Sequence, residues 1–129
     1  MNRLARIVLV LAGLALAAGC ATTGTRPGAI AGRTEVGTAS YYATRYHGRS
    51  TASGKRYDED QWTAAHRTLP FGTRVRVTNL ANRRSVVVTI TDRGPFRRGR
   101  VIDVSKRAAI DLGFYRAGTA RVRVEVVPG

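Results

Sequence analysis

Residues 121–127 alternate polar and apolar side chains (Arg-Val-Arg-Val-Glu-Val-Val), which fits a strand with one buried face. Val122, Val124 and Val126 are therefore expected to point into a core. Residues 73–79 (Thr-Arg-Val-Arg-Val-Thr-Asn) alternate in the same way, with two valines on one face and two arginines on the other. Both segments are predicted to be half-buried strands.

Three further segments have the composition of strands: 85–91, 37–42 and 100–104. The short polar stretch 80–84 has the character of a hairpin loop, so the strands on either side of it should pair antiparallel. A single short helix is expected at 106–112, with Ser105 as its N-cap and Gly113 as its stop. Together these elements predict a mainly β protein built as a small β-barrel, although the pattern does not give the strand order.

Residues 7–18 form an apolar run that follows two basic residues, Arg3 and Arg6. The run is shorter than the about 20 apolar residues that a membrane-spanning helix needs, so a secretory signal is expected. It leads into Ala-Ala-Gly-Cys at residues 17–20, which resembles the bacterial lipobox. Cys20 is the only cysteine of the chain, so it has no internal disulfide partner.

These features predict three regions. Residues 1–19 are expected to be a lipoprotein signal peptide, residues 20–34 a flexible tether with lipid (palmitate) on Cys20, and residues 35–129 one folded domain. The tether is expected because its residues are small and polar and include Gly and Pro without apolar periodicity. A plain secretory signal with an incidental cysteine is the alternative.

The chain is strongly basic, with 22 Lys and Arg against 8 Asp and Glu and a net charge of +14. Such a charge favours an anionic partner or surface. Export argues against nucleic acid and for envelope polyanions such as peptidoglycan carboxylates and anionic lipid. The alternative is that the arginines only form a solvated face.

Two irregular stretches, 51–72 and 91–96, contain the residues that could carry chemistry. Asp92 comes at the end of a predicted strand and precedes an Arg-Gly-Pro turn, so it would project from a rigid sheet edge. Taken alone, Asp92 is more typical of an aspartate that caps a turn, and His66 of a buried histidine that only donates and accepts hydrogen bonds.

Together these stretches resemble the rare lipoprotein A (RlpA) family. The matching runs are GTASYY, YHGRSTASGKRYD, TAAHRTLPFGTRVRVTNLANRRSVVV, ITDRGPF and GRVIDVSKRAA, which lie within residues 37–127 and cover most of them. The resemblance implies a six-stranded double-psi β-barrel with one or two short helices. It also implies an endolytic peptidoglycan transglycosylase, a lyase that cuts between N-acetylmuramic acid (MurNAc) and N-acetylglucosamine (GlcNAc). The product is a 1,6-anhydroMurNAc end, and strands without stem peptides are the expected substrate.

The resemblance further implies roles for single residues. Asp92 is expected to be the catalytic acid and base, and His66 to orient Asp92 or a sugar hydroxyl. Six residues are expected to contact substrate: Tyr42, Lys55, Asp58, Thr63, Arg93 and Phe96. Tyr41 and Trp62 are further candidates for stacking on sugars, although core packing is the favoured interpretation of Trp62.

Lys55 departs from the family pattern, in which a glutamate follows the glycine at position 54. This leaves open a catalytically impaired, glycan-binding lipoprotein as the alternative to an enzyme, and an expansin-like loosener as a weaker third interpretation. No metal or other cofactor and no nucleic acid is expected, and the protein is expected to be a monomer. The expected location is the cell envelope, with the lipid anchor facing the periplasm, in the outer rather than the inner membrane.

Overall fold

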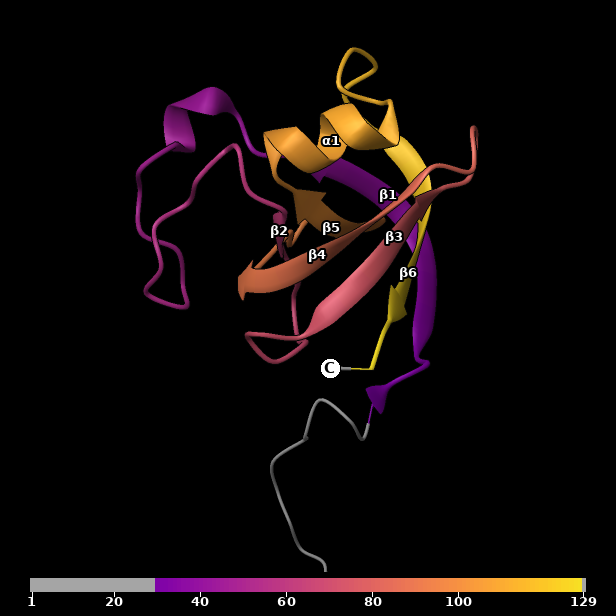
Figure 1. Ribbon diagram of the computed structural model, residues 1–129, viewed down its shortest axis with the longest axis horizontal. Helices are drawn as coiled ribbons and strands as arrows, with labels where there is room; N and C mark the ends of the chain where they lie inside the picture. The colour runs from indigo at the N-terminus through magenta and orange to yellow at the C-terminus, as the bar shows by residue number, and fades with distance from the viewer. Residues whose placement is uncertain (1–29, 129) are drawn as a thin grey trace, which may run out of the picture.

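The computed structural model describes residues 30–128 (Figure 1). Its strands form a closed barrel in the order β1-β5-β2-β4-β3-β6. The elements in chain order are β1 (Thr34–Tyr41), the 3-10 helix η2 (Thr44–Tyr46), β2 (Thr63–Ala65), β3 (Arg74–Asn79), β4 (Ser85–Asp92), β5 (Arg100–Val104), α1 (Lys106–Leu112) and β6 (Ala120–Val126). The predicted mainly β, six-stranded barrel is confirmed.

The barrel mixes antiparallel and parallel pairs. β3 pairs antiparallel with β4 across the hairpin loop, as the sequence predicts, and also with β6. β1 pairs parallel with β5, and β2 pairs parallel with β4. The two strands of each parallel pair are not consecutive in the chain, because β2, β3 and β4 come between β1 and β5, and β3 comes between β2 and β4. The longest connection between consecutive strands, residues 42–62 between β1 and β2, stands out from one side of the barrel (Figure 1).

The alternation of the strands decides which side chains fill the barrel. Val75, Val77, Val122, Val124 and Val126 are buried, whereas the arginines between them are exposed. Burial of one valine side chain contributes about 1.5 kcal/mol or more, so these five positions form a large part of the core. α1 lies across one end of the barrel (Figure 1).

Helix α1 has the predicted bounds and caps. The Ser105 hydroxyl accepts a hydrogen bond from the Ala108 N–H at 3.2 Å, and Gly113 ends the helix in the left-handed conformation at φ 81°. Its buried residues, Ala108, Ala109 and Leu112, lie on the side that faces the barrel. No helix among residues 30–128 is both long and apolar enough to cross a membrane.

The first strand begins earlier than the sequence suggests. β1 starts at Thr34, and Ile30 is already buried in the core cluster. The Gly32 N–H donates to the Val126 carbonyl at 2.8 Å, which ties this entry segment to the end of β6. The expected signal peptide, the lipid site at Cys20 and residues 20–29 of the expected tether lie outside the described residues.

Candidate active site

Asp92 is the last residue of β4, and three donors surround its carboxylate. Oδ1 accepts hydrogen bonds from the backbone N–H groups of Ala52 at 2.8 Å and Arg93 at 2.9 Å. Oδ2 accepts a hydrogen bond from the Tyr42 hydroxyl. One oxygen is therefore fixed by backbone, while the other faces a hydroxyl that can rotate.

The loop that contributes Ala52 is fixed from both sides. Its Thr51 N–H and hydroxyl both donate to the Lys55 carbonyl, at 2.8 and 2.6 Å, which closes the loop on itself. The Ser53 N–H donates to the Thr91 carbonyl at 3.2 Å and so joins the loop to the end of β4. Gly54 at φ 92° allows the reversal, because other residues rarely adopt this conformation.

Tyr42 follows β1 and reaches Asp92 across the barrel end. Its ring stacks on Tyr57, with centroids 4.5 Å apart, and meets the Tyr46 ring edge-on at 6.0 Å. Burial, and then the hydrogen bond to Asp92, raise the pKa of the Tyr42 hydroxyl well above its ordinary value. Tyr42 therefore stays protonated, and in the structure its hydroxyl donates to the Asp92 carboxylate.

A second carboxylate, Asp103 on β5, lies two strands from Asp92. Both aspartates are register partners of Ala65, Asp92 on β4 and Asp103 on β5. The Ser40 hydroxyl donates to Asp103, and the Arg100 Nη1 lies 3.6 Å from its Oδ1. Sequence reasoning missed Asp103. The available signal was a charged residue within the otherwise apolar residues 101–104.

Both carboxylates line one cleft of about 950 Å³, which we call the Asp92 cleft. Of the six expected substrate contacts, Tyr42, Arg93 and Phe96 lie here. Phe96 is 77% exposed and so presents its ring to solvent. Five arginines also line the cleft: Arg45, Arg49, Arg93, Arg97 and Arg100. The cleft thus combines carboxyl groups, aromatic rings and positive charge.

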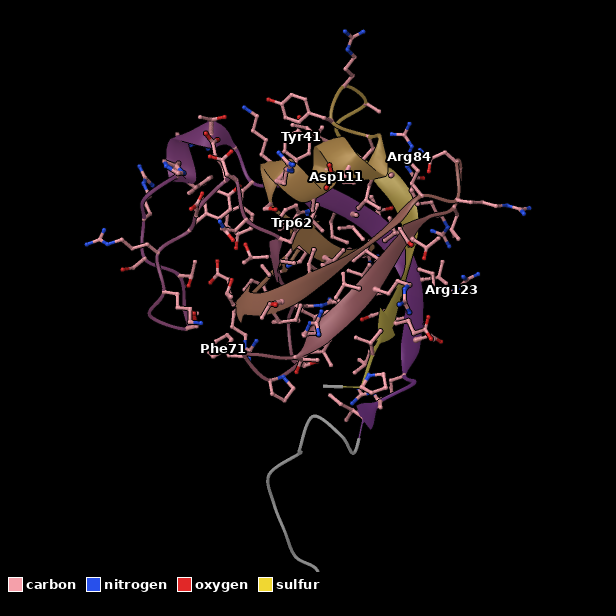
Figure 2. All side chains as sticks on the ribbon, viewed as in Figure 1. Tyr41, Trp62, Phe71, Arg84, Asp111 and Arg123 are labelled. Carbon is pink, nitrogen blue, oxygen red and sulfur yellow. The ribbon has the colours of Figure 1, made fainter. Side chains whose placement is uncertain are left out.

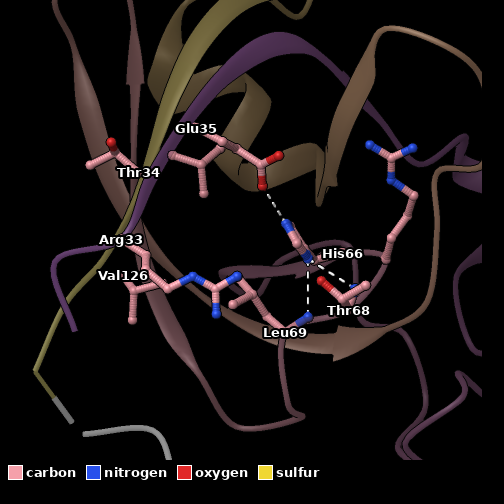
Figure 3. A pocket seen from close by; sticks show the side chains of 9 residues that line it. Arg33, Thr34, Glu35, His66, Thr68, Leu69 and Val126 are labelled. Carbon is pink, nitrogen blue, oxygen red and sulfur yellow. Dashed lines mark hydrogen bonds and ion pairs between the residues drawn. The ribbon is translucent and has the colours of Figure 1, made fainter. Parts of the chain in front are cut away.

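The His66 ring lines a separate pocket of about 450 Å³ (Figure 3), and His66 does not line the Asp92 cleft. Its Nε2 lies 2.6 Å from the Glu35 Oε1, and its Nδ1 accepts from the N–H groups of Thr68 and Leu69, each at 3.1 Å. Because Nδ1 faces two backbone donors, the proton is assigned to Nε2. No hydrogen bond joins the ring to the Asp92 carboxylate within residues 30–128.

His66 is linked to Asp92 through the backbone instead. The His66 N–H donates to the Asp92 carbonyl at 3.1 Å. The Arg93 Nη1 donates to the carbonyls of His66 at 3.2 Å and Leu69 at 2.8 Å. The ring of His66 thus holds the 66–69 turn, and that turn holds Arg93, whose own N–H binds Asp92.

The other expected contacts, Lys55, Asp58 and Thr63, line a third depression of about 460 Å³ beside Trp62, which we call the Trp62 groove. Trp62 is 41% exposed, so the expectation of core packing is wrong. Its Nε1 donates to Asp111 of α1 at 2.8 Å (Figure 2). Tyr41 is half-buried: it packs on the Phe114 and Tyr115 rings and also lines the Asp92 cleft.

The raised pKa of Tyr42 predicts a loss of stability in alkali. A pKa that is higher in the folded than in the unfolded state stabilises the fold fully below the unfolded value of about 10 and progressively less as the pH rises above it. We expect the free energy of unfolding of the wild type to fall more steeply between pH 9 and 12 than that of Tyr42→Phe. Urea unfolding monitored by circular dichroism measures this, and parallel curves would contradict it.

The closed six-stranded barrel, with its two parallel strand pairs, is a double-psi β-barrel. A family described as lytic transglycolase matches residues 34–124, and the chain belongs to it. The endolytic peptidoglycan transglycosylase RlpA of Neisseria meningitidis is 56% identical over 97 residues, which cover 74% of this chain and 41% of that protein. The RlpA of Pseudomonas aeruginosa is 58% identical over 90 residues, or 70% and 26% of the two chains. The predicted relationship to the RlpA family is confirmed.

The chain spans less than half the length of these relatives. Among solved structures, a papain inhibitor from Streptomyces aligns with a TM-score of 0.61 and 25% identity over 75% of this chain and 96% of the inhibitor. An expansin from Clavibacter michiganensis, in complex with cellohexaose, aligns with a TM-score of 0.60 and 20% identity over 74% and 50% of the two chains. The likeness to the expansin is one of fold alone.

Proposed function

We propose that the protein is an endolytic lytic transglycosylase that cleaves peptidoglycan glycan strands between MurNAc and GlcNAc and leaves 1,6-anhydroMurNAc ends. The observation that carries the proposal is the Asp92 carboxylate, which projects into an open cleft with one oxygen fixed and the other beside a hydroxyl. The relatives named as peptidoglycan transglycosylases support it.

One carboxyl can serve both proton transfers of this reaction, because the nucleophile belongs to the substrate. The acid in this mechanism is the protonated form of Asp92, and its proton would stand on Oδ2, since Oδ1 already faces two N–H donors. That proton passes to the glycosidic oxygen as the bond to the MurNAc C1 breaks. The 6-hydroxyl of the same sugar then attacks C1 and gives its proton to the Asp92 carboxylate, which restores the starting acid. No water is consumed.

Other groups of the cleft would support this step. The Asp103 carboxylate, held by Ser40 and Arg100, would stabilise the positive charge that develops at the sugar ring as the bond breaks. The Tyr42 hydroxyl would change its hydrogen-bond role with the protonation state of Asp92. It would donate to Oδ2 when Asp92 is ionised and accept from Oδ2 when Asp92 is protonated. Phe96 would offer an exposed ring to a sugar face.

Lys55, the residue that motivates the binding-only alternative, lines the Trp62 groove and not the Asp92 cleft. Its side chain makes no hydrogen bond to Asp92 within the described range 30–128. A lysine at this position therefore leaves the three donors around the Asp92 carboxylate in place, which favours the enzyme over the binding-only protein.

The test of the proposed function is product analysis. The full mature chain is incubated with purified sacculi, with and without prior removal of stem peptides, and the released fragments are measured by mass spectrometry. We expect fragments that end in 1,6-anhydroMurNAc, which lie one water lighter than hydrolysis products. Hydrolysed ends alone, or no release above a buffer control, would contradict the proposal.

We further propose that the protein works in the bacterial cell envelope, on a lipid anchor at Cys20 that follows cleavage after residue 19. The signal-like residues 1–19 and the lipobox-like end support this, as does a substrate found in the cell wall. The tether would then end before Ile30, which is already packed in the barrel core, and it would carry the barrel domain as a monomer facing the periplasm from the outer membrane.

Replacing Cys20 with serine should remove the anchor. In a bacterial host, we expect the N-terminal peptide of the mature wild type to carry the mass of several acyl chains, because one chain binds a membrane only marginally. The Cys20→Ser protein should carry no lipid mass and should leave the membrane fraction. Mass spectrometry of the N-terminal peptide checks the lipid, and membrane fractionation checks the location. An unmodified wild-type peptide would contradict the anchor.

A further inference from the structure

The Trp62 groove lies outside the Asp92 cleft and has the composition of a binding site for a charged sugar. We infer that it binds a carboxylate-bearing saccharide unit of the same glycan strand that is cut in the Asp92 cleft. This inference rests on the proposed function and extends it to a second contact point. The residues that carry the argument are Lys55, Trp62, Thr63, Arg74, Thr89 and Thr91.

The floor of the groove is one row across three neighbouring strands. Thr63 on β2 is the register partner of Thr89 on β4, and Thr89 is the partner of Arg74 on β3. Thr91 comes two residues after Thr89 on β4 and therefore lies on the same outer face of that strand. The row therefore places hydroxyl groups and a guanidinium side by side on a rigid sheet, as binding of a polar ring requires.

The wall of the groove is the Trp62 ring, which is fixed in its exposed position. Its Nε1 donates to Asp111, and the Arg107 guanidinium lies 5.2 Å from the ring centroid. The backbone is fixed as well, because the Trp62 carbonyl accepts from the Thr89 N–H at 3.1 Å. A large aromatic ring that is held rigid while 41% exposed is suited to packing on the apolar face of a sugar.

The charge of the groove selects an anion. Lys55 and Arg74 are exposed, and neither makes an ion pair within residues 30–128. Arg56 donates to the Gly48 carbonyl at 2.8 Å, and the one acid of the groove, Asp58, accepts from the Asp60 N–H at 2.9 Å. Lys55 and Arg74 are therefore available for a carboxylate on the ligand.

The groove and the Asp92 cleft are neighbours along the same loop and strand. The loop that holds Asp92 has Thr51 in the cleft and Lys55 in the groove, joined by the hydrogen bond from the Thr51 N–H to the Lys55 carbonyl. Thr91 in the groove directly precedes Asp92 in the cleft. A glycan strand that extends past the loop from the cleft thus enters the groove.

MurNAc bears a carboxylate on its lactyl group, or on the stem peptide attached there, whereas GlcNAc bears none. The experiment compares three tetrasaccharides on the full mature chain in the Asp92→Asn background, which prevents turnover. These are the peptide-free GlcNAc–MurNAc strand, the same strand with stem peptides, and the neutral GlcNAc tetramer. Isothermal titration gives each dissociation constant, at low and at high salt.

We expect both carboxylated strands to bind more tightly than the neutral tetramer. Equal affinity for the peptide-free and the peptide-bearing strand would assign the carboxylate bound in the groove to the lactyl group. Tighter binding of the peptide-bearing strand would assign it to the stem peptide. Adding Lys55→Gln should weaken the carboxylated strands by about threefold and leave the neutral tetramer unchanged. Adding Trp62→Ala should weaken all three ligands by about tenfold, and Trp62→Phe should recover most of that loss.

Arg116→Gln is the matched control, because it removes one exposed positive charge outside the cleft and the groove. Equal binding of the neutral and charged ligands, or equal losses in Lys55→Gln and Arg116→Gln, would overturn the inference. Its failure is distinguishable from failure of the proposed function. Anhydro products with no effect of Lys55 or Trp62 would refute the groove alone, whereas carboxylate-selective binding without anhydro products would refute the catalysis alone.

Discussion

Replacing Asp92 with asparagine should abolish transglycosylation, with a fall in the rate of anhydro product of at least about a thousandfold. Asparagine keeps the shape of the side chain, and its carbonyl oxygen can still accept from the Ala52 and Arg93 N–H groups. Its amide cannot give a proton to a glycosidic oxygen or take one from the 6-hydroxyl. The rate of anhydro ends released from peptide-free sacculi, quantified by mass spectrometry, is the measurement.

Asp60→Asn is a matched control for this variant, because Asp60 is exposed and lines none of the three depressions. It should cleave at the wild-type rate. Asp92→Asn should also keep its melting temperature and its sedimentation with sacculi, which would separate lost chemistry from lost folding. A rate within about tenfold of the wild type would mean that another group is the acid, and Asp103 would be the next candidate.

The strands whose side chains alternate clearly between polar and apolar could be predicted from the sequence, and so could the caps of α1. Strand β2 could not, because its three residues, Thr63–Ala65, are too few to show a period. Its absence from the prediction matters for the site. Ala65 on β2 is the register partner of both Asp92 and Asp103, so the two carboxylates are recognised as neighbours only once the parallel and antiparallel pairings are known.

The structure also places the expected site residues in separate depressions of the surface, which a linear motif cannot show. Tyr42, Arg93 and Phe96 meet Asp92 in one cleft, although they come from segments far apart in the chain. Lys55 follows the cleft residue Thr51 by four positions, yet the loop closure between them turns it into the neighbouring groove. Spacing alone cannot reveal which side of such a loop a residue faces.

His66 was expected to orient Asp92 or a sugar hydroxyl, and its contacts instead suggest a positioning role through the 66–69 turn. Replacing it with alanine removes the acceptor for the Thr68 and Leu69 N–H groups and leaves a cavity where the ring was. We expect the free energy of unfolding to fall by about 2–4 kcal/mol. We also expect the rate of anhydro product to fall by about a hundredfold, because Arg93 loses its fixed carbonyl partners.

Glu35→Gln separates this positioning role from a catalytic histidine. In a dyad that moves protons, the carboxylate sets the histidine tautomer, so its amide would impair chemistry severely. Here two backbone N–H groups already fix the His66 tautomer, and the glutamine carbonyl can accept from Nε2 as the glutamate does. We therefore expect Glu35→Gln to change the rate of anhydro product less than about threefold and to leave its pH profile in place. A loss as large as that of His66→Ala would show that the Glu35–His66 pair takes part in proton transfer.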